Sequence, residues 1–208
     1  MRAGTSGWSY PTWRPGFYPA GLDPAEFLAF YASRFPTVEL NTTGYRIPGE
    51  EQFERWAAQA PDGFEFAPKL PGNRLRSLDV FESRVRALGD RLGPIRVQVQ
   101  SARDDGMLEL LLGSLDPSLR LAFDLEHPSW DGVEERLAEA GAVRVNDLET
   151  PAPFRYVRLR EPPYDDAALQ ELAERLRRID EPAYVYFRHE DEPTAPAYAQ
   201  RLVELLSV

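Results

Sequence analysis

Short runs of apolar, strand-forming residues alternate along the chain with longer amphipathic segments. The short runs predict eight strands, at residues 2–7, 37–42, 63–68, 95–100, 119–125, 142–146, 154–159 and 183–188. Apolar residues at helical spacing predict helices between most of them, at residues 24–32, 50–60, 77–92, 104–115, 131–140, 165–179 and 195–206. Strands that are separated by helices are typical of βαβ units and a parallel sheet.

Eight such strands predict a compact (β/α)8 TIM barrel that forms a single domain, residues 1–208. One connection departs from the pattern, because only residues 147–153 lie between the sixth and seventh predicted strands. A crossover helix with its loops needs about 10–12 residues. An extended return to a parallel strand fits this length, and a hairpin with an antiparallel seventh strand is the competing geometry. We favour an α/β barrel that lacks the helix between strands 6 and 7.

Composition narrows the classes of protein to consider. The net charge of −10 argues against a nucleic-acid partner, because binding to a phosphate backbone needs a basic surface. The absence of cysteine excludes disulfides, thiolate catalysis and Cys-ligated metals. No segment has the ~20 consecutive apolar residues that span a bilayer, and the first residues show no signal peptide. The expectation is a soluble cytoplasmic protein with no membrane partner; its oligomeric state does not follow from the sequence.

Lys69 is the only lysine in a chain that has 23 arginines. Lysine is a flexible point charge with a tunable pKa, whereas arginine is a planar group that stays charged. Lys69 lies where the third predicted strand gives way to a loop, and both His127 and His189 also directly follow predicted strands. Lys69 is therefore either a solvated surface residue or part of a site that arginine cannot serve.

In a TIM barrel, catalytic residues belong at the carboxyl ends of the strands. Every predicted strand ends in hydrogen-bonding groups: Ser6, Asn41 to Thr43, Lys69, Gln98 and Gln100, Asp124 to His127, Asn146 and Asp147, Arg158 and Arg160, and Arg188 to Asp191. The opposite strand ends are represented by Ala142, Phe154 and Ala183. This asymmetry indicates a site, but it does not indicate a reaction.

Several segments resemble the YecE-like family, also described as domain of unknown function 72. Residues 4–10 (GTSGWSY) and 127–130 (HPSW) are similar to motifs of that family, as are residues 31–35 (YASRF), 38–43 (VELNTT) and 66–69 (FAPK). The resemblance runs nearly end to end and implies a TIM barrel, but it implies no particular activity. Gly44 and Glu126 depart from the family pattern, which usually has Phe at the first position and often Arg at the second.

The first functional hypothesis is a metal-independent enzyme, a hydrolase, lyase or isomerase, that acts on a small anionic or polyhydroxylated substrate without a cofactor. Its predicted catalytic residues are Lys69, Asp124, His127 and Asp147, since His and carboxylates suit proton transfer and Lys suits anion binding or a Schiff base. Its predicted substrate-binding residues are Trp8, Asn41, Thr42, Tyr45, Gln98, Trp130, Arg158, Arg160 and Arg188. Each of these could instead have a structural role, such as an ion pair, a loop hydrogen bond or packing.

Two other hypotheses stay open at this point. A metal-dependent hydrolase or isomerase would use oxygen and nitrogen ligands at the same strand ends, namely Glu126, His127, Asp147, His189 and Asp191. A non-catalytic protein would bind a partner through the aromatic loop from Trp8 to Tyr18, and Trp13→Ala would then remove binding. We favour the first hypothesis.

Overall fold

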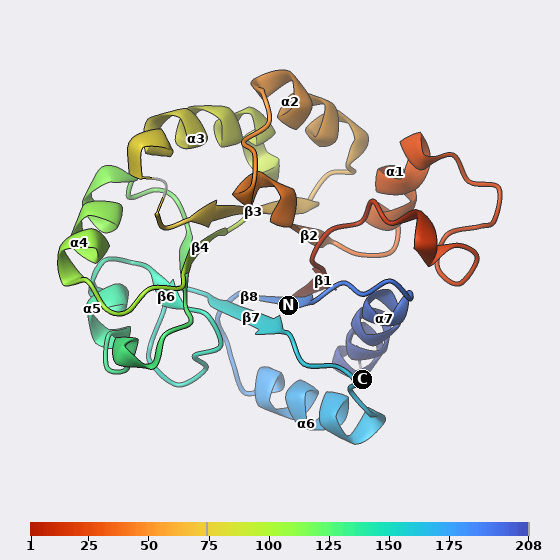
Figure 1. The fold of residues 1–208 in the computed structure, drawn as a ribbon. Helices are drawn as coiled ribbons and strands as arrows, with labels where there is room; N and C mark the ends of the chain where they lie inside the picture. Colours follow the sequence, from red (N-terminus) through yellow and green to blue (C-terminus); the bar gives the residue numbers. More distant parts are fainter. Residues whose placement is uncertain (74, 208) are drawn as a thin grey trace.

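The computed structural model describes residues 1–73 and 75–207 and has eight strands surrounded by helices (Figure 1). The strands are β1 (Arg2–Thr5), β2 (Thr37–Leu40), β3 (Glu65–Pro71), β4 (Ile95–Val99), β5 (Leu121–Leu125), β6 (Val143–Arg144), β7 (Arg155–Leu159) and β8 (Ala183–Phe187). They form two sheets, in the orders β1-β8-β7 and β2-β3-β4-β5-β6, and every pairing is parallel.

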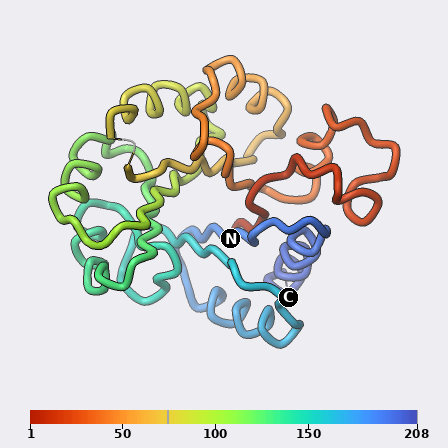
Figure 2. Tube along the Cα trace, in the orientation of Figure 1, coloured from red at the N-terminus to blue at the C-terminus, as the bar shows by residue number. Residues whose placement is uncertain are grey.

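In the described part of the chain, seven α-helices lie outside the strands, and Figure 2 traces the chain through them in the same view. They are α1 (Phe27–Ala32), α2 (Glu50–Gln59), α3 (Leu78–Val85), α4 (Asp105–Ser114), α5 (Glu134–Glu139), α6 (Asp166–Arg177) and α7 (Thr194–Leu206). Short 3-10 helices are η1 (Pro11–Trp13), η2 (Pro24–Glu26), η3 (Asn41–Gly44), η4 (Leu75–Ser77), η5 (Arg86–Arg91) and η6 (Pro128–Trp130). None of the helices within the described residues is long and apolar enough to cross a membrane.

The two sheets meet at two seams. At one seam, Ser6 and Glu39 form an isolated parallel bridge between the end of β1 and β2. At the other, the Asn146 N–H donates to the Tyr156 carbonyl across 2.9 Å. The Asn146 side chain also bonds the N–H and carbonyl of Arg158 at this seam. The strands thus follow one another in the order of a TIM barrel, and within the described residues these contacts stand at the seams in place of a continuous ladder.

The predicted absence of a helix between strands 6 and 7 is confirmed. Residues 145–154, all of which the structure describes, contain turns and extended backbone but no helix. β7 pairs with β8 in parallel, from Arg155 opposite Ala183 to Leu159 opposite Phe187. The antiparallel hairpin that competed with this geometry is therefore wrong.

The third strand is longer than predicted and corrects the position of Lys69. β3 extends to Pro71, so Lys69 lies inside the strand and not in a following loop. Residues up to Pro68 pair with β2, whereas Lys69 is the first residue that pairs with β4. Proline cannot donate to a ladder and is read from sequence as a strand end. Here Pro68 is the point where the strand changes partner.

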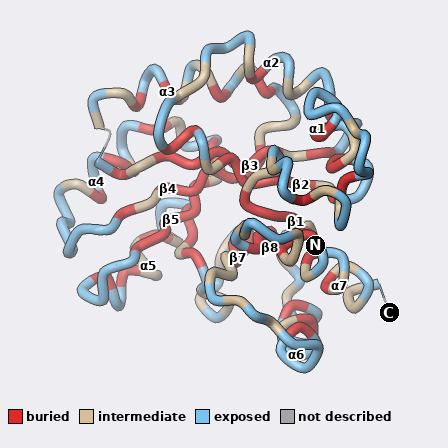
Figure 3. The backbone as a smooth tube through the Cα atoms, turned by 45° about the vertical axis from the view of Figure 1, so that its right-hand side comes forward, coloured by how far each residue is buried: buried red, intermediate tan, exposed pale blue. Residues whose placement is uncertain are grey.

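Burial follows the layers, with the strands buried and the outer helix faces exposed (Figure 3). The space that the strands enclose is filled by small and aromatic side chains, including Ala67, Ala122, Tyr156 and Tyr186. The amino-terminal strand ends are more polar than expected, since Glu65 accepts hydrogen bonds from both Arg120 and the Tyr184 hydroxyl there. Polarity is thus present at both rims and does not by itself locate a site.

Candidate functional site

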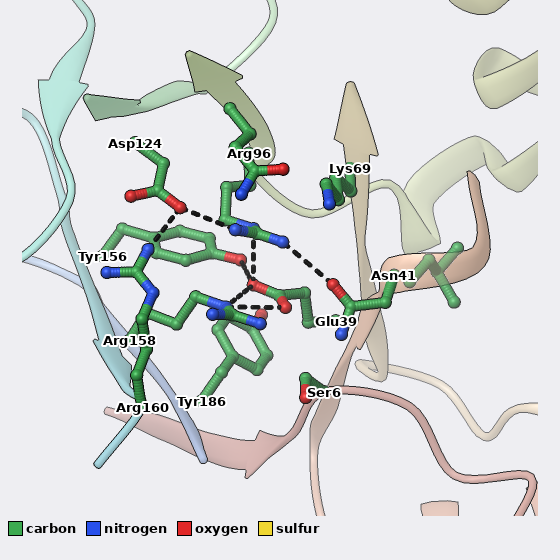
Figure 4. A network of polar contacts seen from close by, with 12 residues as sticks. Ser6, Glu39, Asn41, Lys69, Arg96, Asp124, Tyr156, Arg158, Arg160 and Tyr186 are labelled. Carbon is green, nitrogen blue, oxygen red and sulfur yellow. Dashed lines mark hydrogen bonds and ion pairs between the residues drawn. The ribbon is translucent and has the colours of Figure 1, made fainter. Parts of the chain in front are cut away.

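A buried carboxylate occupies the centre of the carboxyl-terminal half of the strands (Figure 4). Glu39 of β2 is fully buried, and its oxygens lie 2.9 Å from Arg96 Nε and 3.0 Å from Arg158 Nε. The Tyr156 hydroxyl donates to the same carboxylate across 2.7 Å. Burial raises the pKa of Glu39, but Arg96, Arg158 and Tyr156 outweigh that effect and hold the pKa below its ordinary value.

A second carboxylate, Asp124 at β5, connects the remaining arginines. Arg96 Nη1 donates to Asp124 Oδ2 across 2.6 Å, and Arg160 Nη2 donates to the same oxygen. Arg96 also donates through Nη2 to the Asn41 side-chain oxygen, 2.9 Å away. Its Nε–H is close to Glu39 but is not aimed at it, so this group makes an ion pair without a directed hydrogen bond. Arg96 therefore links β2, β4 and β5.

Lys69 completes what we call the polar cluster: Glu39, Lys69, Arg96, Asp124, Arg158 and Arg160. The Lys69 N–H and carbonyl both bond the Thr43 hydroxyl, at 2.9 and 2.8 Å. The ammonium lies 5.4 Å from the centroid of the Tyr45 ring, and among the described residues it has no carboxylate partner. Burial, followed by repulsion from Arg96, lowers the pKa of Lys69 below its ordinary value.

Gly44 makes room for the Lys69 side chain. A Cβ atom at position 44 would lie 2.8 Å from Lys69 Cδ and 2.9 Å from Lys69 Cε. The stem of Lys69 therefore lies directly against the glycine backbone of η3. Gly44 stands where the family usually has Phe, and any larger side chain at this position would have to displace Lys69.

His189 stands at the edge of the polar cluster, next to the loop after β1. Its ring stacks on Tyr10, with 4.6 Å between centroids, and its Nδ1 lies 3.2 Å from Ser6 Oγ. The His189 backbone N–H donates to the same serine oxygen, so the Ser6 hydroxyl is free to donate to Nδ1. This favours a neutral ring that carries its proton on Nε2. Burial, with Arg188 and Arg158 nearby, lowers the pKa of His189.

An open pocket of about 640 Å³ adjoins the polar cluster. The loop after β1, η3 and helix α2 form its walls, and its lining includes Trp8, Tyr10, Asn41, Thr42, Arg46 and Trp56. Asn41 belongs to both features, because it lines the pocket and accepts the hydrogen bond from Arg96. The pocket and the polar cluster are therefore neighbouring parts of one region.

Five of the predicted site residues come together in or beside the polar cluster: Asn41, Lys69, Asp124, Arg158 and Arg160. Trp8 and Thr42 lie in the pocket, and Tyr45 packs near the Lys69 ammonium. Gln98 instead donates to the exposed Glu126 carboxylate, which Gln100 also contacts. Arg188 is exposed and has no ion-pair partner among the described residues.

Three predicted site residues have structural roles instead. His127 is exposed and accepts the Ser129 N–H through Nδ1, so it caps η6. Asp147 accepts the N–H groups of Glu149 and Thr150 in the β6–β7 loop, and these bonds lower its pKa although burial raises it. Trp130 is fully buried, and its indole N–H donates to the Ser101 carbonyl, so it packs in the core.

Sequence reasoning missed the residues at the centre of the site: Glu39, Arg96 and Tyr156. It placed Glu39 and Arg96 inside predicted strands and looked for chemistry only after the strand ends. A signal was present, because a charged residue follows an apolar one in both Thr37-Val38-Glu39-Leu40 and Ile95-Arg96-Val97. Charged residues are rarely buried unless they are paired, so such strand positions indicate an internal ion pair.

Two observations weigh against the metal-dependent and the non-catalytic hypotheses. No group of three or more His, Asp or Glu side chains within residues 1–73 and 75–207 is placed to hold a metal ion, so the ligand set named for a metal enzyme does not assemble. In the aromatic loop, Trp13 and Tyr18 are fully buried, and Tyr18 stacks on Phe27 with 4.0 Å between ring centroids. Trp13→Ala would therefore disturb folding and cannot report on docking.

Comparisons with known proteins place the chain among relatives of the same fold. The UPF0759 protein YecE of Escherichia coli K12 is 30% identical over 148 residues, which cover 64% of this chain and 52% of YecE. The chain spans about half the length of the curated relatives it matches. Crystal structures of DUF72 family proteins from Thermotoga maritima (24% identical, TM-score 0.82) and Enterococcus faecalis (18%, 0.81) cover 100% of this chain and 99% and 95% of their own.

At those identities the two crystal structures show a shared fold. The family model described as "Protein of unknown function DUF72" matches residues 2–208, which is nearly the whole chain. The predicted resemblance to the YecE-like family is thereby confirmed. The chain belongs to the DUF72 family.

Proposed function

We propose that this protein is an enzyme that binds a small anionic substrate at the polar cluster, without a metal. The observation that carries the proposal is an excess of positive charge in the polar cluster, where Lys69 and Arg96 are buried and Arg158 and Arg160 are partly exposed. The polar cluster contains four cationic side chains and two carboxylates, and both carboxylates are already engaged by arginine. Lys69 supplies a cation with no carboxylate partner in the described part of the chain.

An anion is the ligand that such a cluster favours on physical grounds. Unpaired charges are costly to bury, and a bound phosphate or carboxylate would offset the repulsion between Lys69 and Arg96. Arginine and lysine also provide charge-assisted hydrogen bonds to both kinds of anion. The location agrees with this, because TIM-barrel enzymes place their chemistry at the carboxyl ends of the strands.

Proton transfer would fall to His189 and Lys69 in place of the predicted His127. Burial lowers the pKa of Lys69 from its ordinary value of 10.5 toward neutrality, where a catalytic acid or base works best. Burial also lowers the pKa of His189 below 6.5, so its ring is neutral and can accept a proton at neutral pH. Asp124 is held by two arginines, so it serves better to position them than to move a proton. Lys69 could act instead as an amine nucleophile toward a carbonyl group.

Calorimetric titration with inorganic phosphate, sulfate and malonate tests the anion site directly. We expect micromolar to millimolar affinity for at least one anion, decreasing as salt rises, because part of the attraction is electrostatic and screened. Chloride and neutral glycerol serve as the comparison ligands. Equal, negligible heats for every anion at low ionic strength would refute the proposal.

The two histidines offer a second test, because ¹H NMR should resolve one ring signal from each. We expect the His189 signal to titrate below the ordinary pKa of 6.5, and phosphate to raise its pKa by placing negative charge nearby. The signal of His127, which caps η6 at a different place, should not respond to phosphate; His127→Asn assigns the two signals. A phosphate response at His127 alone would contradict the assignment of His189 to the site.

A further inference from the structure

We propose that the pocket beside the polar cluster holds a planar ring, so that the ligand is a ring compound carrying a phosphate or carboxylate. This inference rests on the proposed anion site and names the class of molecule it takes. The ring would lie in the pocket, and the anionic group would reach the polar cluster.

The first support is the aromatic wall of the pocket. Trp8 and Trp56 both line it, with 5.3 Å between their ring centroids and an interplanar angle of 88°. Phe66 of β3 contacts both rings, at 6.4 Å from Trp8 and 6.5 Å from Trp56, and Phe53 packs against Trp56 at 5.5 Å. The two indoles are therefore held in place by the core. A flat ligand can stack on an aromatic ring, so this wall favours a planar molecule. Little side-chain freedom is lost on binding, because the two indoles are already held in place.

The second support is the charge of the lining. Arg46 and Arg55 line the pocket together with Gln52, and none of its lining residues is Asp or Glu. Arg55 is engaged, with its Nη2 on the Gln52 side-chain oxygen at 2.8 Å and its Nη1 3.8 Å from the exposed Glu51 carboxylate outside the lining. Arg46 is exposed and has no ion pair in the described residues. An acidic protein with a net charge of −10 thus presents a pocket without negative charge. This favours an anionic ligand over a neutral or cationic ring.

The third support is the continuity between the pocket and the polar cluster. Asn41 lines the pocket and holds Arg96 through its side-chain oxygen. Tyr10 also lines the pocket and stacks on His189. Figure 4 shows the side chain of Asn41, the first residue of η3, pointing toward Arg96, with Lys69 on the neighbouring strand. A ligand in the pocket therefore has the anion site and the candidate proton-transfer residue at its inner end.

Three phosphate monoesters separate the contributions of ring and anion: methyl phosphate, cyclohexyl phosphate and phenyl phosphate. Measured by calorimetry, phenyl phosphate should bind about tenfold tighter than methyl phosphate, because the apolar surface of its ring is buried in the pocket. It should bind several-fold tighter than cyclohexyl phosphate, because the indoles favour a flat ring. Phenyl phosphate should also change the tryptophan fluorescence, which comes partly from Trp8 and Trp56, while Trp13 and Trp130 are fully buried.

Two variants make the test specific. Trp56→Leu should weaken phenyl phosphate about tenfold and leave methyl phosphate unchanged. Arg46→Ala, at an exposed position where the fold is not at risk, should weaken the monoesters several-fold; Arg34→Ala, outside the pocket, is its control. Equal affinity for the three monoesters would overturn the ring pocket and leave the anion site standing. Failure of all three to bind would overturn both proposals.

Discussion

Replacing Glu39 with glutamine should lower the free energy of unfolding by about 3–5 kcal/mol. Glu39 forms ion pairs with both Arg96 and Arg158, and it is fully buried. Removing one partner of a buried ion pair is costly because the other charge stays buried without compensation. Glutamine keeps the size of the side chain and can still accept the Tyr156 hydroxyl, so the measured loss reports on charge. Urea unfolding followed by circular dichroism measures it.

Glu109→Gln is the matched control, because Glu109 pairs with Arg136 on the surface. Exposed ion pairs of this kind contribute little to stability, because water and salt screen the two charges. A second readout is the dependence on pH. The pKa of Glu39 is lower in the folded state than its ordinary value of 4.5, so its stabilisation is fully present above pH 4.5 and is lost as pH falls through the folded-state pKa. Glu39→Gln should lose less stability over that acid range than the wild type; equal losses would contradict the assignment.

Replacing Lys69 with methionine should reduce anion affinity by roughly 10–100-fold while leaving the protein at least as stable. One charge-assisted hydrogen bond contributes about 1.5–3 kcal/mol, which corresponds to that range of affinity. The stability follows from the lowered pKa of Lys69, which shows that the folded state disfavours the charged ammonium. Calorimetric titration with phosphate and a thermal melt measure the two effects on the same samples.

The effect of pH identifies the ammonium as the binding group. Anion binding needs charged Lys69, so affinity should fall as pH rises through its lowered pKa, earlier than the ordinary value of 10.5 would allow. Lys69→Met should lack this decrease. Gly44→Ala keeps the charge but pushes the flexible lysine stem aside, so it should weaken binding less than Lys69→Met does. Unchanged affinity in both variants would remove Lys69 from the anion site.

Much of the fold was predictable because it follows from local periodicity. The strands predicted at residues 95–100 and 183–188 placed β4 and β8 to within one residue, and the short interval after residue 146 predicted the missing helix. Boundaries were less predictable where tertiary pairing overrides local preference. β3 continues through Pro68 to Pro71 because its first half pairs with β2 and its second half pairs with β4.

The site was only partly predictable, because several predicted residues share a residue type but not an environment. His127 and His189 both follow a strand, yet one caps an exposed turn and the other stacks on Tyr10 beside the arginines. Pro128 and Ser129 follow His127 and form the turn that it caps, but the residues beside His189 do not show that it lies near the arginines. The difference arises from the loop after β1, which lies some 180 residues away along the chain and beside His189 in space.

The sequence alone determined the family, the alternation of strands and helices, and the prominence of Lys69, because these depend on residue order and composition. Only the tertiary structure determined which charges meet. Glu39, Arg96 and Asp124 come from three strands, and their pairing depends on which side chains point inward at the same level of neighbouring strands. Strand register is a long-range property, so the central ion pairs, the unpaired lysine and the aromatic pocket became visible only once the strands were placed side by side.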